Sequence, residues 1–282
     1  MNFLRANVDW FVPDGKPILD ALSRCTHLCI AAHQDDVEIL AYPGISSCYN
    51  RPDEWFTGIV VTDGAGSIRE KQHQNLSSEE YSALRRTEQR KAADIGRYGA
   101  AIQLGFSTNS VKKQTGTLYD DLLEIIHFTQ PHTLYLHSPA DRHQTHVAVF
   151  LHCLKALREL SVNLIPQQIY GCEVWGSLDW LPRHRRIGLN SGDRPALAAQ
   201  LLNVFSSQIA GGKRYDLGTI GRRQANATFS DPYAPDPSSG ITWAMDLLPL
   251  VKQPDLSVET FLQELTDEFS AELRTRVHQF TS

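Results

Sequence analysis

The stretch that decides the fold is Leu28-Cys29-Ile30-Ala31-Ala32-His33-Gln34-Asp35-Asp36. Its first five residues are all apolar, which is typical of a short strand that is buried on both faces of a sheet. One imidazole and two adjacent carboxylates follow this run at once. A buried strand that ends in such side chains predicts a metal site at the point where the strand stops.

A second polar cluster lies further along the chain, in Pro139-Ala140-Asp141-Arg142-His143-Gln144-Thr145-His146. It follows another apolar run, residues 134–136. If His143 and His146 open a helix, their spacing of three residues places both rings on one face of it. One ring can then bind a metal ion while the other faces the substrate.

The residue types of the two clusters suit a catalytic zinc ion. Zinc takes imidazole nitrogen and carboxylate oxygen ligands, and a catalytic site uses three protein groups so that one position stays open for water or substrate. His33, Asp36 and His146 supply such a set. Asp35 projects differently from Asp36 and remains free as a proton acceptor beside the metal. Zinc is therefore the predicted cofactor, although such a site can hold another divalent ion.

Short apolar runs alternate with longer amphipathic segments along the chain, and this pattern predicts an α/β fold with a mostly parallel sheet flanked by helices. Ligands of such sheets bind beyond the carboxyl ends of the strands. His33, Asp63 and Asp141 each follow an apolar run, so we expect them to meet at one cleft. We expect strands near 27–32, 57–62, 100–104, 132–137, 168–174 and 241–246, and helices near 38–49, 79–98, 117–129, 144–160 and 256–278.

One domain is expected over residues 1–282, with a core of residues 1–175 that carries both clusters and a part of residues 176–282 that completes it. Within the second part, the turn-rich segment 231–240 reads as a mobile loop. The polar insertion 64–78 follows a predicted site strand and reads as a lid or a specificity loop. A Gly-x-Gly-x-x-Gly motif does not follow the first strand, so a dinucleotide cofactor is not expected.

Composition limits the choice of partners. A net charge of −5 argues against a general nucleic-acid binder, and we read the basic run Arg183-His184-Arg185-Arg186 as a solvated surface loop. No stretch approaches the ~20 apolar residues that span a bilayer, and residues 1–7 do not resemble a leader, so a cytoplasmic protein without membrane contact is expected. The five cysteines have no Cys-x-x-Cys spacing, which suits free thiols in a reducing compartment.

Together the two clusters resemble the LmbE-like, or PIG-L, family of zinc-dependent N-deacetylases, whose signatures are Ala-His-Pro-Asp-Asp-x-Glu and Pro-x-Asp-x-His-x-x-His. The resemblance is carried by about the first 175 residues and implies a Rossmann-like sheet with the metal at the carboxyl ends of its strands. It implies that His33, Asp36 and His146 hold zinc, that Asp35 is the general base and that His143 stabilises the oxyanion. The family's usual substrates imply an N-acetylglucosamine unit as the small-molecule partner.

Further positions follow from the same resemblance. Arg85, three residues before Glu88, is a candidate substrate contact, although it could merely pair with Glu88 across one helical turn. Asp63 is either a turn former or a substrate contact. Glu38 is expected to support the helix start or to orient a ligand. Asp141 is expected to replace, as partner of an imidazole, the aspartate that many members carry where this chain has Thr145.

Several alternatives stay open. Gln34 stands where proline is usual in the family, and with Thr145 it is the sequence hint for a degenerate site in a non-catalytic sugar-binding protein. A zinc amidase that acts on a larger sugar-amine conjugate would keep all five site residues. His137 could line the pocket, and Glu173 and Trp175 could touch a sugar, although a core tryptophan is as good a reading. A homo-oligomer is possible.

Overall fold

The computed structural model describes residues 8–69, 71–114 and 117–281. The N-terminal stretch 1–7, on which the expectation about a leader rests, lies outside the described residues. Across the described part of the chain, no helix combines the length and the apolar character that a membrane span requires.

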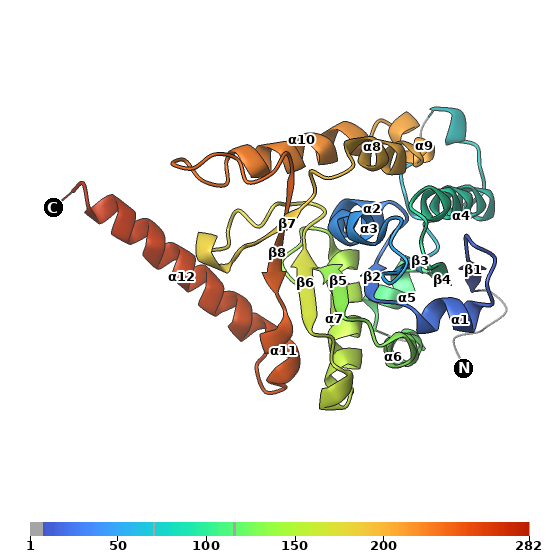
Figure 1. The fold of residues 1–282 in the computed structure, drawn as a ribbon, viewed down its shortest axis with the longest axis horizontal. Coiled ribbons are helices and arrows are strands. Elements are labelled where there is room, and N and C mark those ends of the chain that lie inside the picture. The colour runs from blue at the N-terminus through green and yellow to red at the C-terminus, as the bar shows by residue number, and fades with distance from the viewer. Residues whose placement is uncertain (1–7, 70, 115–116, 282) are drawn as a thin grey trace.

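An eight-stranded sheet forms the centre of the molecule, in the order β1-β4-β3-β2-β5-β6-β8-β7 (Figure 1). The five strands from β4 to β6 run parallel, and β1, β8 and β7 are antiparallel additions at the two edges. The mostly parallel α/β fold predicted from the sequence is therefore confirmed. The strands are β1 (Asp9–Phe11), β2 (His27–Ala31), β3 (Phe56–Thr62), β4 (Ala100–Phe106), β5 (Thr133–His137), β6 (Gln168–Cys172), β7 (Ile187–Asn190) and β8 (Ile241–Asp246).

Helices cover both faces of this sheet. The longer ones are α1 (Ile18–Ser23), α3 (Tyr42–Cys48), α4 (Ser78–Ile95), α6 (Leu118–Thr129), α7 (Gln144–Arg158), α8 (Pro195–Asn203), α10 (Tyr215–Thr228) and α12 (Val258–His278), and the five-residue ones are α2 (Asp36–Leu40), α5 (Thr108–Lys112), α9 (Ser206–Ala210) and α11 (Leu248–Lys252). Figure 1 shows α2, α3, α4, α8 and α10 on one side of the sheet and α1, α6, α7 and α11 on the other.

The alternation of side chains along each strand explains why the sheet has a hydrophobic core on each of its two faces. Successive side chains of a strand point to opposite faces. Leu28 and Ile30 of β2 therefore join the core under α1, α6 and α7, whereas Cys29 and Ala31 join the core under α2, α3 and α8. Every one of these four side chains is fully buried, which is why the decisive stretch reads as a continuous apolar run.

One expectation about the helices is wrong, and another holds only in part. The helix expected over 38–49 is two helices, because the chain leaves helical geometry at Ala41 and Pro43 then occupies the first turn of α3. The helix expected over 256–278 does form, but only its first half closes the core, with Phe261 and Leu265 buried. Its outer half projects from the body (Figure 1). Helices α8, α9 and α10 follow no strong periodic pattern along the chain, and α9 and α10 contribute Gln208 and Tyr215 to the cleft described below.

Arg223 joins the C-terminal part to the site helix. This residue of α10 is 5% exposed, and its Nη2 donates to the carbonyl oxygens of Glu38, at 2.7 Å, and Ile39, at 3.1 Å, in the last turn of α2. Its guanidinium also stacks 4.6 Å from the centre of the Tyr42 ring. A buried cation therefore satisfies the free carbonyls of a short helix.

We expect Arg223→Ala to lower the free energy of unfolding by about 2–4 kcal/mol, because charged hydrogen bonds are lost and buried carbonyls lose their donor. Urea denaturation measures this. Arg276→Ala is the matched control, because Arg276 is exposed and, among the residues that the structure describes, pairs with Glu272 one helical turn away. It should change the free energy of unfolding by less than about 0.5 kcal/mol. Equal effects of the two substitutions would contradict the anchoring role.

Candidate metal site and active-site cleft

The two clusters meet at the place where the order of the strands reverses. From β2 the chain proceeds to β3 and β4 on one side, and β5 then pairs with the opposite edge of β2. The loops that follow β2 and β5 are therefore neighbours at the carboxyl end of the sheet. In open α/β sheets this is where ligands bind.

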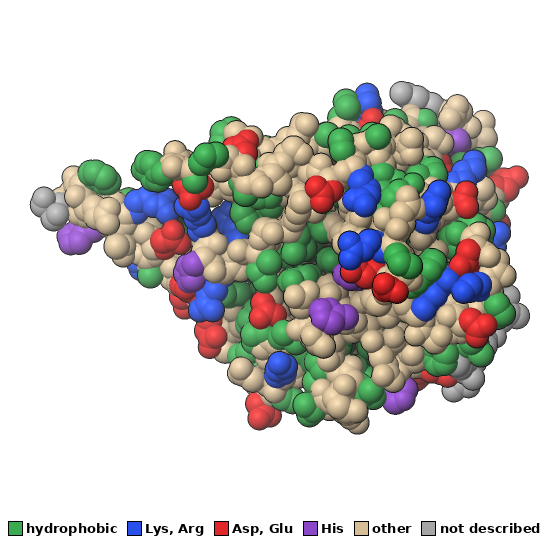
Figure 2. Space-filling model, in the orientation of Figure 1, with side chains coloured by type: hydrophobic (Ala, Val, Ile, Leu, Met, Phe, Trp, Pro, Cys, Tyr) green, Lys and Arg blue, Asp and Glu red, His purple; other side chains and the backbone are tan. Residues whose placement is uncertain are grey.

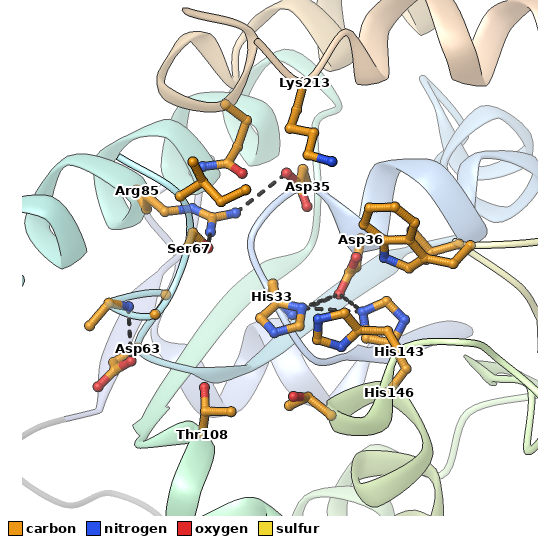
Figure 3. A pocket seen from close by; sticks show the side chains of 18 of the residues that line it. His33, Asp35, Asp36, Asp63, Ser67, Arg85, Thr108, His143, His146 and Lys213 are labelled. Atoms are coloured by element: carbon orange, nitrogen blue, oxygen red, sulfur yellow. Dashed lines mark hydrogen bonds and ion pairs between the residues drawn. The ribbon is translucent and has the colours of Figure 1, made fainter. Parts of the chain in front are cut away.

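The turn after β2 gives the two adjacent carboxylates different directions. Asp35 has a φ of 87°, in the region that residues with a side chain rarely adopt, and such a conformation costs about 1–3 kcal/mol. Its N–H donates to Gln89 Oε1 at 3.3 Å, which helps to hold the turn. Figure 3 shows Asp36 directed toward the histidines, whereas Asp35 is directed toward Arg85 and Lys213.

Asp36 lies at the centre of the predicted ligand set. Its Oδ2 lies 3.0 Å from His33 Nδ1 and 3.2 Å from His146 Nε2, and these two nitrogens lie 3.2 Å from each other. Tetrahedral zinc with bonds of about 2.0–2.2 Å keeps its ligand atoms roughly 3.3–3.6 Å apart. The three atoms thus need to separate only slightly to hold such an ion, and His33, the most exposed of the three residues, faces the cleft.

Charge also favours a cation here. Burial alone would raise the pKa of Asp36, but the facing rings of His146 and His33 hold it well below its ordinary value. Asp36 is therefore a buried carboxylate that stays ionised through its contact with positive or hydrogen-bonding partners. A divalent ion bound to the same three atoms would supply that positive charge directly, so the residues present fit a metal.

Asp141 fixes the orientation of the His146 ring. Its Oδ1 lies 3.2 Å from His146 Nδ1 and accepts the N–H of His143 at 2.9 Å, and its Oδ2 accepts the N–H of Val174 at 2.8 Å. With Nδ1 held in this way, Nε2 is the atom that faces Asp36 and His33. The structure thus places Asp141 where the supporting carboxylate was expected, and Thr145 Oγ1 has no hydrogen-bond partner among the described residues.

His143 begins α7 at the mouth of the site. Its ring centre lies 5.0 Å from that of His33 and 4.5 Å from that of His146. Burial and the neighbouring His146 lower the pKa of His143 to about 4, so this imidazole is neutral at pH 7. A neutral ring can donate a hydrogen bond to a group in the cleft from whichever nitrogen carries its proton.

Arg85 supports Asp35 from α4. Its guanidinium donates to Ser67 Oγ and, at 2.5 Å, to the carbonyl oxygen of Gln34, and it lies 3.4 Å from Asp35 Oδ2. The alternative pairing with Glu88 does not form, because Glu88 accepts hydrogen bonds from the backbone and hydroxyl of Ser207 instead. Arg85 lines the cleft, but most of its donors already bind the protein.

Asp63 and Glu38 lie away from the ligand atoms. Asp63 Oδ1 accepts the N–H of Ala65 at 3.0 Å and so closes a turn at the far side of the cleft (Figure 3). Glu38 Oε1 accepts hydrogen bonds from Tyr98 Oη at 2.7 Å and from Gln89 Nε2 at 2.8 Å. Because Gln89 also binds the N–H of Asp35, Glu38 acts on the turn of Asp35 rather than on a metal ligand.

Gln34 fills the space behind the same turn. Its Nε2 donates to Gln103 Oε1 at 3.1 Å, across β3 to β4. Gly64 makes room for it, since a Cβ on Gly64 would lie 2.4 Å from Gln34 Oε1, and the φ of +73° also favours glycine. Gln34 therefore changes the packing behind the site without adding a group to the cleft.

His137 supports the site from β5. It is fully buried and its ring stacks on that of His146 with centres 4.0 Å apart. Its Nε2 lies 3.6 Å from Asp36 Oδ2, yet the N–H of Ala32 already donates to this nitrogen at 2.9 Å. We therefore assign His137 to packing against the ligand set rather than to the set itself.

A cleft of about 740 Å³ lies over these side chains. The insertion contributes residues 64–68 and Ser78 to its wall, and α5 contributes Thr108 and Lys112. Trp175, Lys213 and Tyr215 form another wall. Lys213 and Tyr215 had no signal in the sequence, because the glycine-rich loop before α10 and the start of α10 lie far from both motifs along the chain.

We expect His146→Ala to abolish stoichiometric binding of a divalent metal, because it removes one of three ligands and the partner of Asp141. Elemental analysis of the purified protein measures this. His152→Ala is the matched control on the same helix, because His152 Nε2 contacts the carbonyl of Val111 and faces away from the site. Unchanged metal content in His146→Ala would remove this residue from the ligand set.

Comparison with known proteins gives one match to a family model. Residues 28–157 match the PIG-L family model, described as GlcNAc-PI de-N-acetylase. No curated protein matches the chain significantly in sequence.

Solved structures share the fold at low identity. N,N'-diacetylchitobiose deacetylase from Pyrococcus horikoshii has a TM-score of 0.58 at 16% identity, covering 78% of this chain and 82% of its own. A deacetylase of the teicoplanin biosynthetic pathway has a TM-score of 0.58 at 16% identity, with coverage of 78% and 97%. GalB, a 4-carboxy-2-hydroxymuconate hydratase from Pseudomonas putida, has a TM-score of 0.57 at 14% identity, with coverage of 79% and 96%.

A hydratase among these structures shows that the fold alone does not define the reaction. The family match is more specific, since residues 28–157 contain both motifs and all the ligand atoms described above. Through these residues the chain resembles the PIG-L family.

Proposed function

We propose that this protein removes the N-acetyl group from an N-acetylglucosamine-type sugar or sugar conjugate, with zinc held by His33, Asp36 and His146. The observation that carries the proposal is the close triangle of three ligand atoms at the cleft, with edges of 3.0, 3.2 and 3.2 Å. A carboxylate outside the ligand set, Asp35, and a neutral imidazole, His143, line the same cleft. These are the groups that metal-assisted hydrolysis of an amide requires.

The bound ion would supply two kinds of chemistry, a water of lowered pKa and polarisation of the amide carbonyl. Asp35 is placed to take the proton of the attacking water. Burial raises the pKa of Asp35 well above its ordinary value, although the Arg85 guanidinium opposes this. A carboxyl group with a raised pKa can hold the proton and then deliver it to the departing amine.

His143 is placed to stabilise the developing oxyanion. It is half-buried at the N-terminus of α7, and its neutral ring faces the cleft beside His33. A preorganised donor at this point acts more strongly than in water, because the cleft wall excludes solvent from one side. Trp175, whose ring is 6.3 Å from that of His143, gives the acyl group or the sugar an apolar surface.

We expect Asp35→Asn to fold, to keep its metal and to lose about 10²–10⁴-fold in kcat, because the amide cannot accept the proton. Asparagine tolerates positive φ, so the turn should survive. Single-turnover and steady-state rates, measured together with metal content, test this. Asp63→Asn is the matched control, since Asp63 lines the far side of the cleft and an amide oxygen can still accept the N–H of Ala65. Activity close to wild type in Asp35→Asn would exclude the base role.

The proposed function is tested by amine release from N-acetylglucosamine compounds with zinc-loaded protein. We expect release by the wild type and release slowed about 10²–10⁴-fold in Asp35→Asn. A second candidate is an amidase for larger sugar-amine conjugates, and the cleft of about 740 Å³ leaves room for a larger acyl group. Parallel assays with acetyl and longer acyl substrates distinguish the two. If the compounds bind but none of them is hydrolysed, a non-catalytic sugar-binding protein is favoured instead.

A further inference from the structure

A second group of potential metal ligands lies at the opposite end of the sheet from the cleft. Among the residues that the structure describes, three sets of His, Cys, Asp or Glu side chains bring their ligand atoms within 4.8 Å of one another. Two of these sets share His146 and belong to the site described above. The third set is His27, Cys48 and Glu54, which we call the thiol cluster.

The fold brings these three residues to the amino ends of the strands. His27 is the first residue of β2, and Cys48 is the last residue of α3, the helix that returns the chain toward the start of β3. Glu54 shortly precedes β3, whose first residue, Phe56, pairs with His27 in the sheet. The catalytic ligands follow the carboxyl end of β2, so the length of this strand separates them from the thiol cluster.

The thiol and the imidazole of this cluster face each other directly. Cys48 Sγ lies 3.3 Å from His27 Nδ1. Zinc bonds of about 2.3 Å to sulfur and about 2.0–2.1 Å to nitrogen keep these two kinds of atom roughly 3.5 Å apart in a tetrahedral site. The pair therefore already has nearly the spacing of two ligands of one metal ion.

The lone pair of His27 Nδ1 is available to this thiol. Thr26 Oγ1 lies 3.1 Å from the same nitrogen but donates to the carbonyl oxygen of Trp55 at 3.3 Å. Burial lowers the pKa of His27, so its ring is neutral at pH 7, and burial raises the pKa of the Cys48 thiol to about 12. The thiol proton therefore lies between the sulfur and the nitrogen, where a metal ion would replace it.

Backbone hydrogen bonds hold the segments of His27 and Glu54 together. The N–H groups of Thr26 and His27 both donate to the carbonyl oxygen of Trp55, at 3.0 and 3.1 Å. The N–H of Trp55 donates in return to Thr26 Oγ1 at 2.8 Å. Trp55 directly follows Glu54, so the backbone of the glutamate is anchored beside the imidazole. Ligands that the backbone positions in this way form a preorganised site.

The present partner of Glu54 does not prevent it from binding a metal ion. Glu54 Oε1 accepts a hydrogen bond from Arg51 Nη2 at 3.2 Å, and the side chain of Arg51 is 59% exposed. Basic and acidic side chains are interspersed over the face drawn in Figure 2, and an exposed ion pair contributes little to stability. A divalent ion on the other two ligands carries more charge than the guanidinium and would draw the carboxylate inward.

We propose that the thiol cluster is a second metal site, which takes zinc or another thiophilic divalent ion through Cys48 Sγ, His27 Nδ1 and a carboxylate oxygen of Glu54. On binding, the thiol releases its proton to solvent and the sulfur bonds the metal as a thiolate. The ion joins the end of α3 to the starts of β2 and β3 and thereby stabilises the fold. Because a proton and an ion pair must be given up, this site binds metal less tightly than the catalytic site and fills when metal ion is added.

Cobalt(II) distinguishes the two sites, because a thiolate ligand gives this ion a near-ultraviolet charge-transfer band that imidazole and carboxylate ligands do not give. The catalytic ligand set contains no sulfur. We therefore expect titration of the wild-type protein with cobalt to produce the band, and His146→Ala to keep it. Cys48→Ala should lose it. Cys153→Ala is the matched control, because Cys153 is also a buried thiol but lies on α7, in the core on the other face of the sheet.

Glu54→Gln tests the third ligand without changing a buried residue. It should weaken cobalt binding, followed by the same band, by at least about tenfold, since loss of an outer-shell partner alone costs a metal site about 10–100-fold. Glu272→Gln is its matched control, because Glu272 also pairs with an arginine at the surface but lies outside the ligand sets of the described residues. It should leave cobalt binding unchanged.

Absence of the band in the wild type, with cobalt well in excess of protein, would overturn the proposal. A band that survives in Cys48→Ala, or that disappears equally in both cysteine variants, would do the same. A melting temperature that rises with added zinc in the wild type and in His146→Ala, but not in Cys48→Ala, supports the stabilising role. These readouts do not depend on amine release, so they hold whether or not the proposed function does.

Discussion

The contact on which the site depends is that of one buried carboxylate, Asp36, with two imidazoles that arrive from different parts of the chain. Ionised carboxylates are costly to bury unless they are paired. Here His33 comes from the turn after β2 and His146 from α7, so the pairing exists only when β2 and β5 are adjacent. The reversal of strand order is therefore what brings the ligand set together. Asp141 links this set to the end of β6, because its Oδ2 accepts the N–H of Val174.

Much of this arrangement could be predicted from the sequence, for a physical reason. Strands buried on both faces must be apolar throughout, and polar residues can follow only where such strands stop. The run at 28–32 and the run at 134–136 therefore marked both the sheet and its functional edge. The site residues within each cluster are only a few positions apart along the chain, so their spacing can be read directly from the sequence. The structure brings together the predicted ligands and Asp141, and it places Asp35 and His143 on the same cleft.

What could not be predicted depends on contacts between distant segments. Glu38 was expected to support the helix start or to orient a ligand, and only its contacts with Tyr98 and Gln89 show that it acts on the turn of Asp35 at the start of α2. Arg85 looked like a partner for Glu88 or a substrate, but the turn at Gln34 and Asp35 takes its donors. Lys213 and Tyr215 reach the cleft only because α10 lies across α2, held there by Arg223. None of these contacts has a characteristic spacing along the chain.

The fit of Gln34 against Gly64 has an evolutionary consequence. Proline, which is usual in the family at the first of these positions, has no amide to offer Gln103 and occupies less of the space behind the turn. A side chain at position 64, in turn, would strain the backbone at a φ of +73° and force Gln34 to shift. A lineage that exchanges Gln34 with Gly64 for proline with a larger residue at position 64 therefore passes through an intermediate. That intermediate is overcrowded if position 64 changes first and underpacked if position 34 changes first. Positions 34, 64 and 103 should accordingly change as a group among relatives of this chain, and each combination should be inherited as a unit.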